Sequence, residues 1–314
     1  MEERTGLVCG HEGARVNRAL TIPVEEHSRV LANAHDVPEE APSFRIGLTS
    51  VGISGKTLWV RLPFGQLPFD ANIGVSLPAD SRGIHMSRME EAVSSLCGRP
   101  FNDLCFYARA LAELVIKRQR GGIAYVNLKG KVPVRRIASV SNRISTDALD
   151  IEARVEVTRL ETELDFKETI GLSVSHITAC PCTQVYNEEL FSAKGNSFPL
   201  ITHSQRSFTR LFIERYGEDP SYEDLLKCLE AALHVTQDLL KRSDEAEMVM
   251  RAHLAPQFAE DAVRQTAREV GIHFGTAMPA RTEVMIESRS LESIHIHDVC
   301  CTLKTTLGDI IHAL

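Results

Sequence analysis

The sequence predicts an α+β protein in which strands and helices follow one another in the same order twice. Apolar and polar side chains alternate over residues 151–158, which indicates a strand with one packed and one solvent-facing side. Elsewhere, apolar residues recur at helical spacing after capping residues. The order of strand pair, helix pair and strand pair occurs over residues 44–143 and again over residues 148–304, without convincing sequence identity between the two halves.

The first half opens with a segment that lacks periodicity and contains scattered glycine and proline, so we expect an arm there. Two alternating stretches separated by glycines then indicate a hairpin. Capping residues mark the starts of two helices. In chain order, the predicted elements are an arm over 1–42, strands over 44–51 and 57–62 joined by a turn at 52–55, helices capped by Ser87 and Asn102, and a strand over 123–137.

The second half repeats this order with longer helices. A serine after a proline caps the first of them, and a proline suits the first turn of the next, which a glycine should end. In chain order, the predicted elements are strand structure over 151–174, a strand over 207–215, a helix capped by Ser221 with apolar residues as far as Leu240, a helix from Pro256 to Gly271, and strands over 282–287 and 294–303.

The chain of 314 residues is long enough for about two domains. Its formal charge of −7 leaves no net positive field for nucleic acid or an anionic membrane, so an anionic ligand requires a local basic pocket. No apolar run approaches the length of a membrane span, and the N-terminus lacks a signal-peptide core. We therefore expect a cytoplasmic protein without nucleic-acid or membrane partners, whose eight cysteines fill the core or carry chemistry.

The densest cluster of reactive side chains spans residues 175–184 and 199–207. Its sequence Cys180-Pro-Cys182 lacks the two-residue gap of a zinc knuckle, so ordinary packing is the competing interpretation. One thiolate, His203 and a carboxylate from farther along would form a three-ligand site with an open position for water. Such a site suits zinc or ferrous iron, and the order of metal affinities alone does not choose between them.

Acidic and histidine side chains later in the chain are further candidates. Glu245 follows the predicted end of a helix and Glu260 falls in the first turn of another, where solvated charge and dipole complementation are the simpler explanations. His295 and His297 lie in a predicted strand and would share one of its faces, which would aim both into one pocket. Paired surface histidines also occur by chance, so this assignment has an equally simple alternative.

Five motifs follow one another in the C-terminal half: Thr178-Ala-Cys-Pro-Cys182, Thr202-His-Ser-Gln-Arg206, Leu240-Lys-Arg-Ser-Asp-Glu245, Pro256-Gln-Phe-Ala-Glu-Asp-Ala-Val263 and Glu292-Ser-Ile-His-Ile-His297. In this order they resemble the motifs of the type IB GTP cyclohydrolases, which include an archaeal methanopterin-pathway form and a bacterial folate-pathway form. The segment from Arg45 to Gly52 also resembles the opening strand of that family. The insert over 183–202 is longer than in the compact bacterial form and resembles the archaeal arrangement.

This resemblance implies a tunnelling fold, whose unit has two antiparallel strands, two helices and two more strands. Each chain would carry two units in tandem, with helices on one face of the antiparallel sheets, in agreement with the doubled element order. The resemblance also implies a homo-oligomer, usually a tetramer, with active sites at subunit interfaces. The predicted organisation is an arm at 1–42, a first unit at 43–145, and a second unit at 146–314 that carries most site residues.

The resemblance implies roles for individual residues as well. The metal ligands would be Cys180, His203 and Glu245, whereas Cys182 is not assigned. Glu260 would anchor the purine or pterin ring, and it could accept two hydrogen bonds from the guanine edge. The implied proton-transfer group is His295, with His297 or Glu292 in support. The nearest cations for a triphosphate are Arg206, Arg210, Lys241 and Arg242. For each of these cations, solvated surface charge is the alternative interpretation.

The implied reaction opens the imidazole ring of GTP at C8 and releases formate, with one divalent metal per active site. Fe(II) is the first choice of metal, and zinc or manganese are alternatives. The product would be 7,8-dihydroneopterin triphosphate or 7,8-dihydroneopterin 2′,3′-cyclic phosphate, the first step of a pterin or folate-type pathway. Two other interpretations stay open: a nitrile-reductase relative with a cysteine nucleophile and NADPH, and a non-catalytic purine- or pterin-binding protein.

Overall fold

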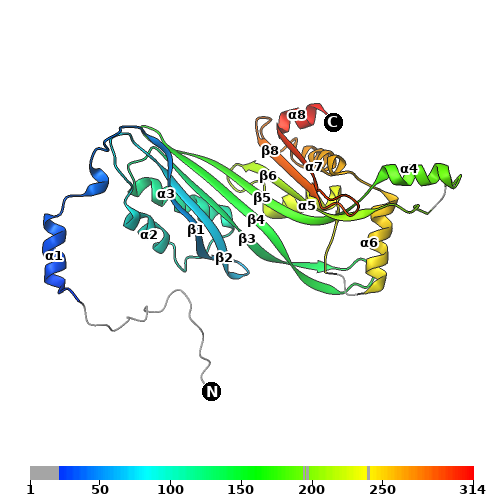
Figure 1. The fold of residues 1–314 in the computed structure, drawn as a ribbon, viewed down its shortest axis with the longest axis horizontal. Coiled ribbons are helices and arrows are strands. Elements are labelled where there is room, and N and C mark those ends of the chain that lie inside the picture. The colour runs from blue at the N-terminus through cyan, green and yellow to red at the C-terminus, as the bar shows by residue number, and fades with distance from the viewer. Residues whose placement is uncertain (1–20, 194, 196–197, 239–240) are drawn as a thin grey trace, which may run out of the picture. The chain divides into compact units, whose positions relative to one another are not determined.

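The computed structural model describes residues 21–193, 195, 198–238 and 241–314, and it confirms an α+β protein with an antiparallel sheet (Figure 1). The chain divides into two compact units. Unit 1 comprises the residues up to 128 together with 155–166, and unit 2 comprises 129–154 and 167–314. The three boundaries fall inside the long strands β3 (Ile123–Ile137), β4 (Ile144–Arg159) and β5 (Leu164–Ala179). The predicted segments 43–145 and 146–314 do not coincide with these units, and their status as structural repeats stays a prediction.

Unit 1 is a long hairpin covered by two helices. Its own elements are α1 (Val24–Asn33), the short 3-10 helix η1 (Val37–Glu39), β1 (Leu48–Leu62), β2 (Gly65–Leu77), α2 (Met86–Ser94) and α3 (Leu104–Arg118). The strands lie in the order β1, β2, β3 and β4, and α3 packs against α2, β1 and β2. Leu104, Leu111 and Val115 of α3 are fully buried in this contact, as their helical spacing predicts.

The predicted turn at Gly52 and Gly55 is wrong, because β1 runs through both positions and pairs with β2 along its length. The chain turns instead at Gly65, whose φ is +129°. Gly52 permits the close approach of the two strands, since a Cβ atom there would lie 1.9 Å from the Ile73 carbonyl oxygen. Gly55, at a φ of +65°, accompanies a shift in the pairing register. Both glycines therefore serve an irregular strand, which the sequence pattern did not distinguish from a turn.

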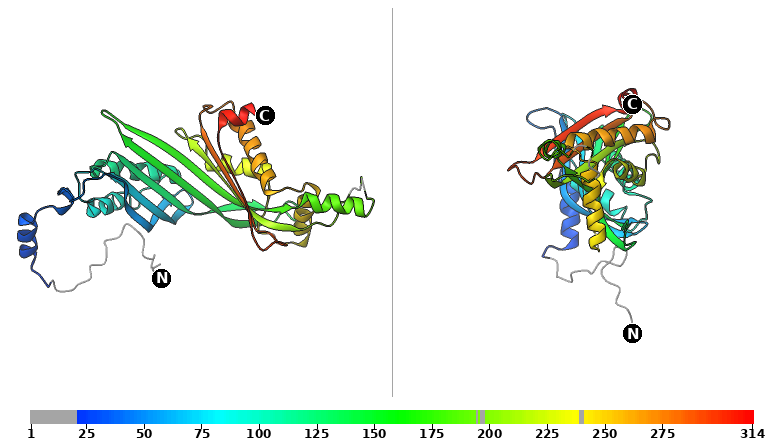
Figure 2. Two further views of the ribbon diagram at one scale, coloured as in Figure 1. Left: turned by 45° about the horizontal axis from the view of Figure 1, so that its top comes forward. Right: turned by 90° about the vertical axis from the view of Figure 1, so that its right-hand side faces the viewer.

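Unit 2 contains the rest of the sheet and the remaining helices. Its elements, besides its parts of β3, β4 and β5, are α4 (Pro181–Leu190), β6 (Ser204–Arg215), α5 (Tyr222–Ala232), β7 (His234–Val235), α6 (Arg242–Leu254), α7 (Ala259–Phe274), β8 (Glu283–Ser290), β9 (Val299–Thr306) and α8 (Leu307–His312). The sheet continues from β4 through β5, β6 and β8 to β9, and β7 pairs with β5. Helices α5 and α7 pack together and against β6, and α7 also covers β8 and β9 (Figure 2).

The helices of unit 2 begin closer to their predicted positions than they end. Ser221 caps α5 and forms a capping box with Asp224, as its position after Pro220 predicts. However, α5 ends at Ala232, and the separate helix α6 follows. Gly271 does not end α7, because it lies inside the helix against α8, where a Cβ atom would meet Ile310 Cγ2 at 2.7 Å. It is therefore a packing glycine.

Two predicted strand assignments also need correction. The strand structure expected over 151–174 is divided between β4 and β5 by a turn, in which the Leu160 N–H donates to the Glu163 carbonyl at 2.9 Å. The strand expected over 294–303 begins only at Val299, so its first residues belong to the loop between β8 and β9. The packed side of β4 is confirmed, because Ile151, Ala153, Val155 and Val157 are buried, but Glu152 on the side expected to face solvent is buried as well.

Candidate active site

Cys180 and His203 lie beside each other where β5 ends and β6 is about to begin. The Cys180 N–H donates to the His203 carbonyl at 3.1 Å, and the Thr202 hydroxyl donates to the Cys180 carbonyl at 2.7 Å. Because Pro181 opens α4, Cys180 is its N-cap, a position where the helix dipole favours negative charge. The Thr183 hydroxyl points at the Cys180 sulfur at 3.7 Å. The backbone therefore brings together the two predicted metal ligands that flank the insert.

A short hydrogen-bond chain connects His203 to the predicted late acid. His203 Nδ1 lies 3.1 Å from Gln205 Oε1, and Gln205 Nε2 lies 3.3 Å from Glu292 Oε1. Ser290, at the end of β8, donates to the same Glu292 oxygen at 2.9 Å. The structure thus brings Glu292 into contact with the surroundings of His203, as a shared site requires.

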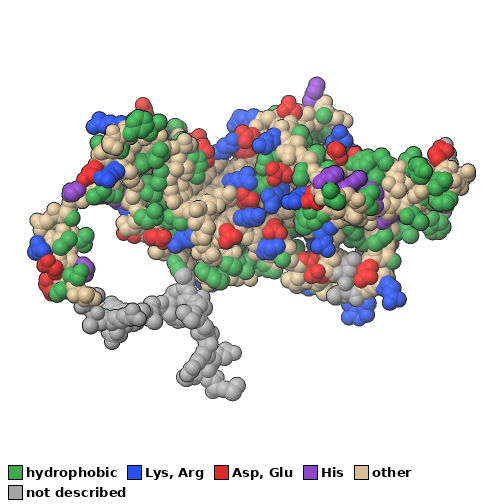
Figure 3. All heavy atoms as spheres, viewed as in Figure 1, with side chains coloured by type: hydrophobic (Ala, Val, Ile, Leu, Met, Phe, Trp, Pro, Cys, Tyr) green, Lys and Arg blue, Asp and Glu red, His purple; other side chains and the backbone are tan. Residues whose placement is uncertain are grey.

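His295 and His297 join this cluster from a loop and not from the predicted strand. Their rings stack with centroids 5.4 Å apart, and the His295 ring stands edge-on to His203 at 6.4 Å. Both residues are exposed. Figure 3 shows histidine side chains gathered on the surface near the start of α4. The prediction that both histidines approach one site is compatible with this arrangement, although loop packing and not strand alternation places them.

Glu245 lies in the first turn of α6, whereas the sequence pattern placed it beyond a helix end. The adjacent Asp244 is buried and anchors this turn, because its Oδ1 accepts hydrogen bonds from the Val140 and Ser141 N–H groups at 3.1 and 2.9 Å. Hydrogen bonding to Ser141 lowers the pKa of the Asp244 carboxyl. Glu245 itself is exposed and lines an open, mostly apolar cavity of about 550 Å³.

The three predicted ligands do not close around one point within a single chain. In the described part of the chain, Cys180, His203 and Glu245 are not a group whose ligand atoms all lie within 4.8 Å of one another. Glu245 shares its cavity with residues 199–201, which lead directly to Thr202 and His203. Glu245 on α6 therefore faces the same cavity as the segment that leads to His203, and its approach to the other two ligands stays a prediction.

The predicted phosphate-binding cations are spread over unit 2. Arg206 lines a polar cavity of about 420 Å³ that also contains Arg136 and several aspartates. Strand alternation puts Arg206 on the opposite face of β6 from the buried Ser207. Lys241 is the N-cap residue of α6, and Arg242 opens that helix and lines the Glu245 cavity. Arg206 and Arg242 therefore line different cavities.

Glu260 is exposed in the first turn of α7, the position expected from the sequence. This helix packs along β9, the last strand of the sheet. Burial, and then the nearby Glu260 charge, raise the pKa of the Cys301 thiol on β9. Glu260 therefore lies close to Cys301, whereas Cys180 and His203 lie at the ends of β5 and β6.

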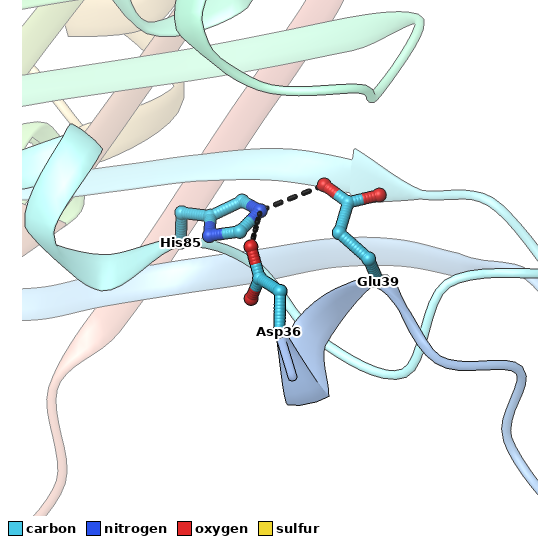
Figure 4. Close-up of side chains that lie close together, drawn as sticks. All are labelled: Asp36, Glu39 and His85. Atoms are coloured by element: carbon cyan, nitrogen blue, oxygen red, sulfur yellow. Dashed lines mark hydrogen bonds and ion pairs between the residues drawn. The ribbon is translucent and has the colours of Figure 1, made fainter. Parts of the chain in front are cut away.

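A second group of side chains that could hold a metal ion lies in unit 1, and the sequence interpretation missed it. Figure 4 shows Asp36 and Glu39 approaching the ring of His85, and the ligand atoms of the three residues lie within 4.8 Å of one another. His85 Nε2 lies 2.8 Å from Glu39 Oε1 and 3.8 Å from Asp36 Oδ2. Arg120 also donates to Glu39 at 2.8 Å, and His85 and Arg120 together lower the pKa of the Glu39 carboxyl. The triad has the composition of a metal site. However, Glu39 of η1 also pairs with His85 and Arg120, so the same group is an ion-pair cluster that holds η1 against the rest of unit 1.

Comparison with known proteins establishes the family. The family profile described as Type I GTP cyclohydrolase folE2 matches residues 34–301. The chain belongs to this GTP cyclohydrolase family. GTP cyclohydrolase MptA of Methanococcoides burtonii is 30% identical over 89% of this chain and 96% of its own length. GTP cyclohydrolase MptA of Methanocaldococcus jannaschii is 28% identical over 88% of this chain and 96% of its own length.

Among solved structures, a uricase from Bacillus fastidious shares the fold, with a TM-score of 0.50 and 8% sequence identity over 84% of this chain and 95% of the uricase chain. At this identity the similarity concerns the fold alone. The family match confirms the resemblance found in the five C-terminal motifs, and it also covers residues 34–42 of the predicted arm. In the described ranges, none of the helices is both long and apolar enough to cross a membrane.

The donor set of the predicted metal site suits the metals expected for this cyclohydrolase family member. Thiolate sulfur, imidazole nitrogen and carboxylate oxygen together fit zinc or iron. The Nδ1 atom of His203 already contacts Gln205, so Nε2 is the nitrogen left for a metal. Cys228, by contrast, is buried, and burial raises the pKa of its thiol to about 12, which makes it a poor ligand or nucleophile.

Sequence interpretation missed the polar residues that support the site. Gln205 and Ser290 received no role, although both contact Glu292. One available signal was the position of Gln205 two residues after His203, which keeps both side chains on the same side of an extended backbone. The contribution of Ser290 depends on the pairing of β6 with β8, which no local pattern reveals.

Proposed function

We propose that this chain is a metal-dependent GTP cyclohydrolase that opens the guanine imidazole ring at C8 and releases formate. The observation that carries the proposal is the convergence of Cys180, His203, Glu292 and His295 at one end of unit 2. The family match and the MptA relatives support the same activity. They favour it over the nitrile-reductase and non-catalytic interpretations of the sequence.

Cys180, His203 and Glu245 would hold one divalent metal. Bound there, the metal would lower the pKa of water and supply hydroxide near neutral pH. The mixed sulfur, nitrogen and oxygen donors suit Fe(II), the metal proposed first, and zinc alike, and manganese is a further alternative. The exposed position of Glu245 on the anchored first turn of α6 leaves its carboxylate accessible for such a bond.

Glu260 would bind the guanine ring. A carboxylate can accept hydrogen bonds from the guanine N1–H and 2-amino groups at once, which fixes the position of C8. Both carboxylate oxygens are available for this task because Glu260 is exposed. Arg206, Lys241 and Arg242 remain the proposed partners of the triphosphate.

His295 would move the protons. Its ring lies beside His203, so a neutral imidazole can take a proton from the attacking water, and the imidazolium can return it to the ring nitrogen that leaves C8. The stacked His297 would position the His295 ring. Glu292 would place a carboxylate charge near His203, and its donors Gln205 and Ser290 would hold that carboxylate in position.

The proposal includes a tunnelling fold with tandem units and a homotetramer whose active sites lie at subunit interfaces. The element order supports it, because two strands, two helices and two strands are followed by the same order interrupted by α4, β7 and α6. The product would be 7,8-dihydroneopterin triphosphate or the 2′,3′-cyclic phosphate. The longer insert over 183–202 resembles the archaeal arrangement, and mass spectrometry of the product would distinguish the two.

The direct test incubates the anaerobically purified, metal-loaded protein with GTP. We expect equimolar formate and a pterin that fluoresces after oxidation. Absence of both products would contradict the proposed function. Retention of GTP without turnover would instead support a binding protein.

Single substitutions should separate the metal site from the guanine site. Cys180→Ala and His203→Ala should each lose bound metal and all measurable turnover, because each removes one of three ligands. Glu260→Ala should keep its metal but raise the KM for GTP by about 100-fold, the loss expected for a charge-assisted bidentate contact. Metal content by mass spectrometry and steady-state kinetics measure the two effects. Full metal content in Cys180→Ala would overturn the ligand set.

A further inference from the structure

Gln205 contacts a proposed metal ligand and a proposed catalytic acid at the same time. Its Oε1 lies 3.1 Å from His203 Nδ1, and its Nε2 lies 3.2 Å from Ser290 Oγ and 3.3 Å from Glu292 Oε1. All of these groups are at least partly buried, so water competes for them less than at an open surface.

These contacts determine which way the amide of Gln205 faces. A carboxylate only accepts hydrogen bonds, so the NH₂ group must face Glu292 and the amide oxygen must face His203. The amide oxygen also only accepts, so the proton of the neutral His203 ring must be on Nδ1. The Nε2 atom of His203 then carries the lone pair that a metal needs.

The network is attached to the interior of unit 2. Ser290 Oγ donates to Glu292 Oε1 at 2.9 Å and lies 3.4 Å from Thr178 Oγ1, which in turn lies 2.9 Å from Ser207 Oγ. The exposed fractions of Ser290, Thr178 and Ser207 are 1%, 1% and 0%. Buried hydroxyls keep their partners because an unpaired one is costly. These hydroxyls on β5, β6 and β8 therefore give Gln205 a rigid support.

We propose that Gln205 is a positioning residue that holds His203 as the Nδ1–H tautomer and links it to Glu292. The inference rests on the proposed function, since it assumes that His203 binds a metal through Nε2. Partners of a metal-binding histidine commonly change metal affinity by about 10- to 100-fold when they are removed. The same side chain would also hold Glu292 beside the metal-binding histidine.

Two substitutions separate these roles. Gln205→Leu keeps a side chain of similar size and removes the contacts with His203, Ser290 and Glu292. Gln205→Glu keeps an acceptor for His203 Nδ1 but removes the NH₂ group that donates to Glu292. Gln257→Leu is the matched control, because Gln257 is also partly buried and donates to a backbone carbonyl, that of Ala232, at 3.0 Å. Thermal unfolding of all variants checks that they fold.

Zn²⁺ affinity, measured by competition with a chromogenic chelator, is the first readout. We expect Gln205→Leu to weaken Zn²⁺ binding by about 10- to 100-fold, and Gln205→Glu and Gln257→Leu to bind Zn²⁺ within about threefold of the unaltered protein. Gln205→Glu should nevertheless turn over GTP more slowly, because Glu292 loses one of its two donors and keeps only Ser290. Unchanged affinity in Gln205→Leu, or an equal loss in Gln205→Glu, would overturn the proposal.

The second readout is the ¹⁵N chemical shifts of the His203 ring in the metal-free protein, which report the tautomer directly. We expect Nδ1–H in the unaltered chain and a mixture of tautomers in Gln205→Leu. An Nε2–H ring in the unaltered chain would contradict the inference. If the unaltered protein bound no Zn²⁺ and formed no product, the proposed function would fail, while the ring nitrogens would still decide the role of Gln205.

Discussion

His176 shows how a single buried side chain can make stability depend on pH. Its exposed fraction is 0%, and its Nε2 lies 2.8 Å from Thr209 Oγ1. Burial, and then the nearby His234, lower the pKa of His176 from 6.5 to about 4. The folded protein therefore keeps this ring neutral, whereas the unfolded chain binds its proton near pH 6.5.

The stability that His176 contributes should be complete above pH 6.5 and should be lost as the pH falls toward 4. We expect its share of the loss between pH 7 and pH 5 to be about 2 kcal/mol of unfolding free energy. Urea unfolding at both pH values, for the unaltered chain and for His176→Gln, measures this share as the difference between the two losses. Equal losses in both proteins would show that His176 does not titrate in this way.

Short motifs predicted Cys180 and His203 as ligands of one metal, because a thiol and an imidazole are common metal ligands wherever they occur in a sequence. The motifs did not predict roles for Gln205 or Ser290, because these two residues meet only when β6 pairs with β8. In that register Ser207 stands opposite Ser290, 83 positions away in the chain. Information of this range is absent from any local pattern, so the support of the site could not be read from the sequence.

Among the structural elements, β1 depends most clearly on one small residue. Gly52 lies so close to β2 that a Cβ atom would overlap the Ile73 carbonyl oxygen at 1.9 Å. Backbone cannot move aside as a flexible side chain can. The hairpin therefore tolerates only glycine at this position.

Gly52→Ala should lower the free energy of unfolding by about 3 kcal/mol or more, the upper range for an overpacked site. Gly122→Ala is the control within unit 1, because a Cβ atom there meets nothing within 4 Å, and its effect should stay within about 0.5 kcal/mol. Chemical denaturation of both variants provides the comparison. Similar stabilities would mean that β1 and β2 can separate locally at little cost.

Helix starts were easier to predict than helix ends. The start of α5 is predictable from Ser221 and Asp224, because their capping contacts lie within one helical turn. The end of α5 at Ala232 depends instead on β7 pairing with β5, and the apolar residues beyond it continued the helical spacing. Gly271 was mistaken for an end because the close packing of α8 against it was invisible in the sequence.

At the scale of the whole molecule, the proposed site residues divide into separate groups within one chain. Cys180, His203 and Glu292 are connected by hydrogen bonds, whereas Glu260 lies by Cys301 on β9. Helix α4, next to Cys180, also exposes apolar side chains to solvent, a property typical of subunit contacts. The exposed fractions are 59% for Val185, 68% for Tyr186 and 60% for Leu190.

If each active site takes Cys180 from one subunit and Glu260 from another, two inactive variants should restore each other. Random co-assembly of Cys180→Ala and Glu260→Ala chains in equal amounts should yield about one quarter of the full activity, since one site in four then has both intact residues. Turnover after co-expression of the two variants measures this. Activity no higher than that of each variant alone would place both residues in the same subunit.

The three strands shared between the compact units also determine how the gene can be dissected. The chain passes from one unit to the other within β3, β4 and β5, at residues 128, 154 and 166. Cutting the chain at any one of these boundaries therefore leaves at least one unit without one of its strand segments. The missing segment exposes an unpaired strand edge that can bind other chains. Neither unit is encoded by one continuous stretch of DNA, so neither can be transplanted, duplicated or deleted as an independent module.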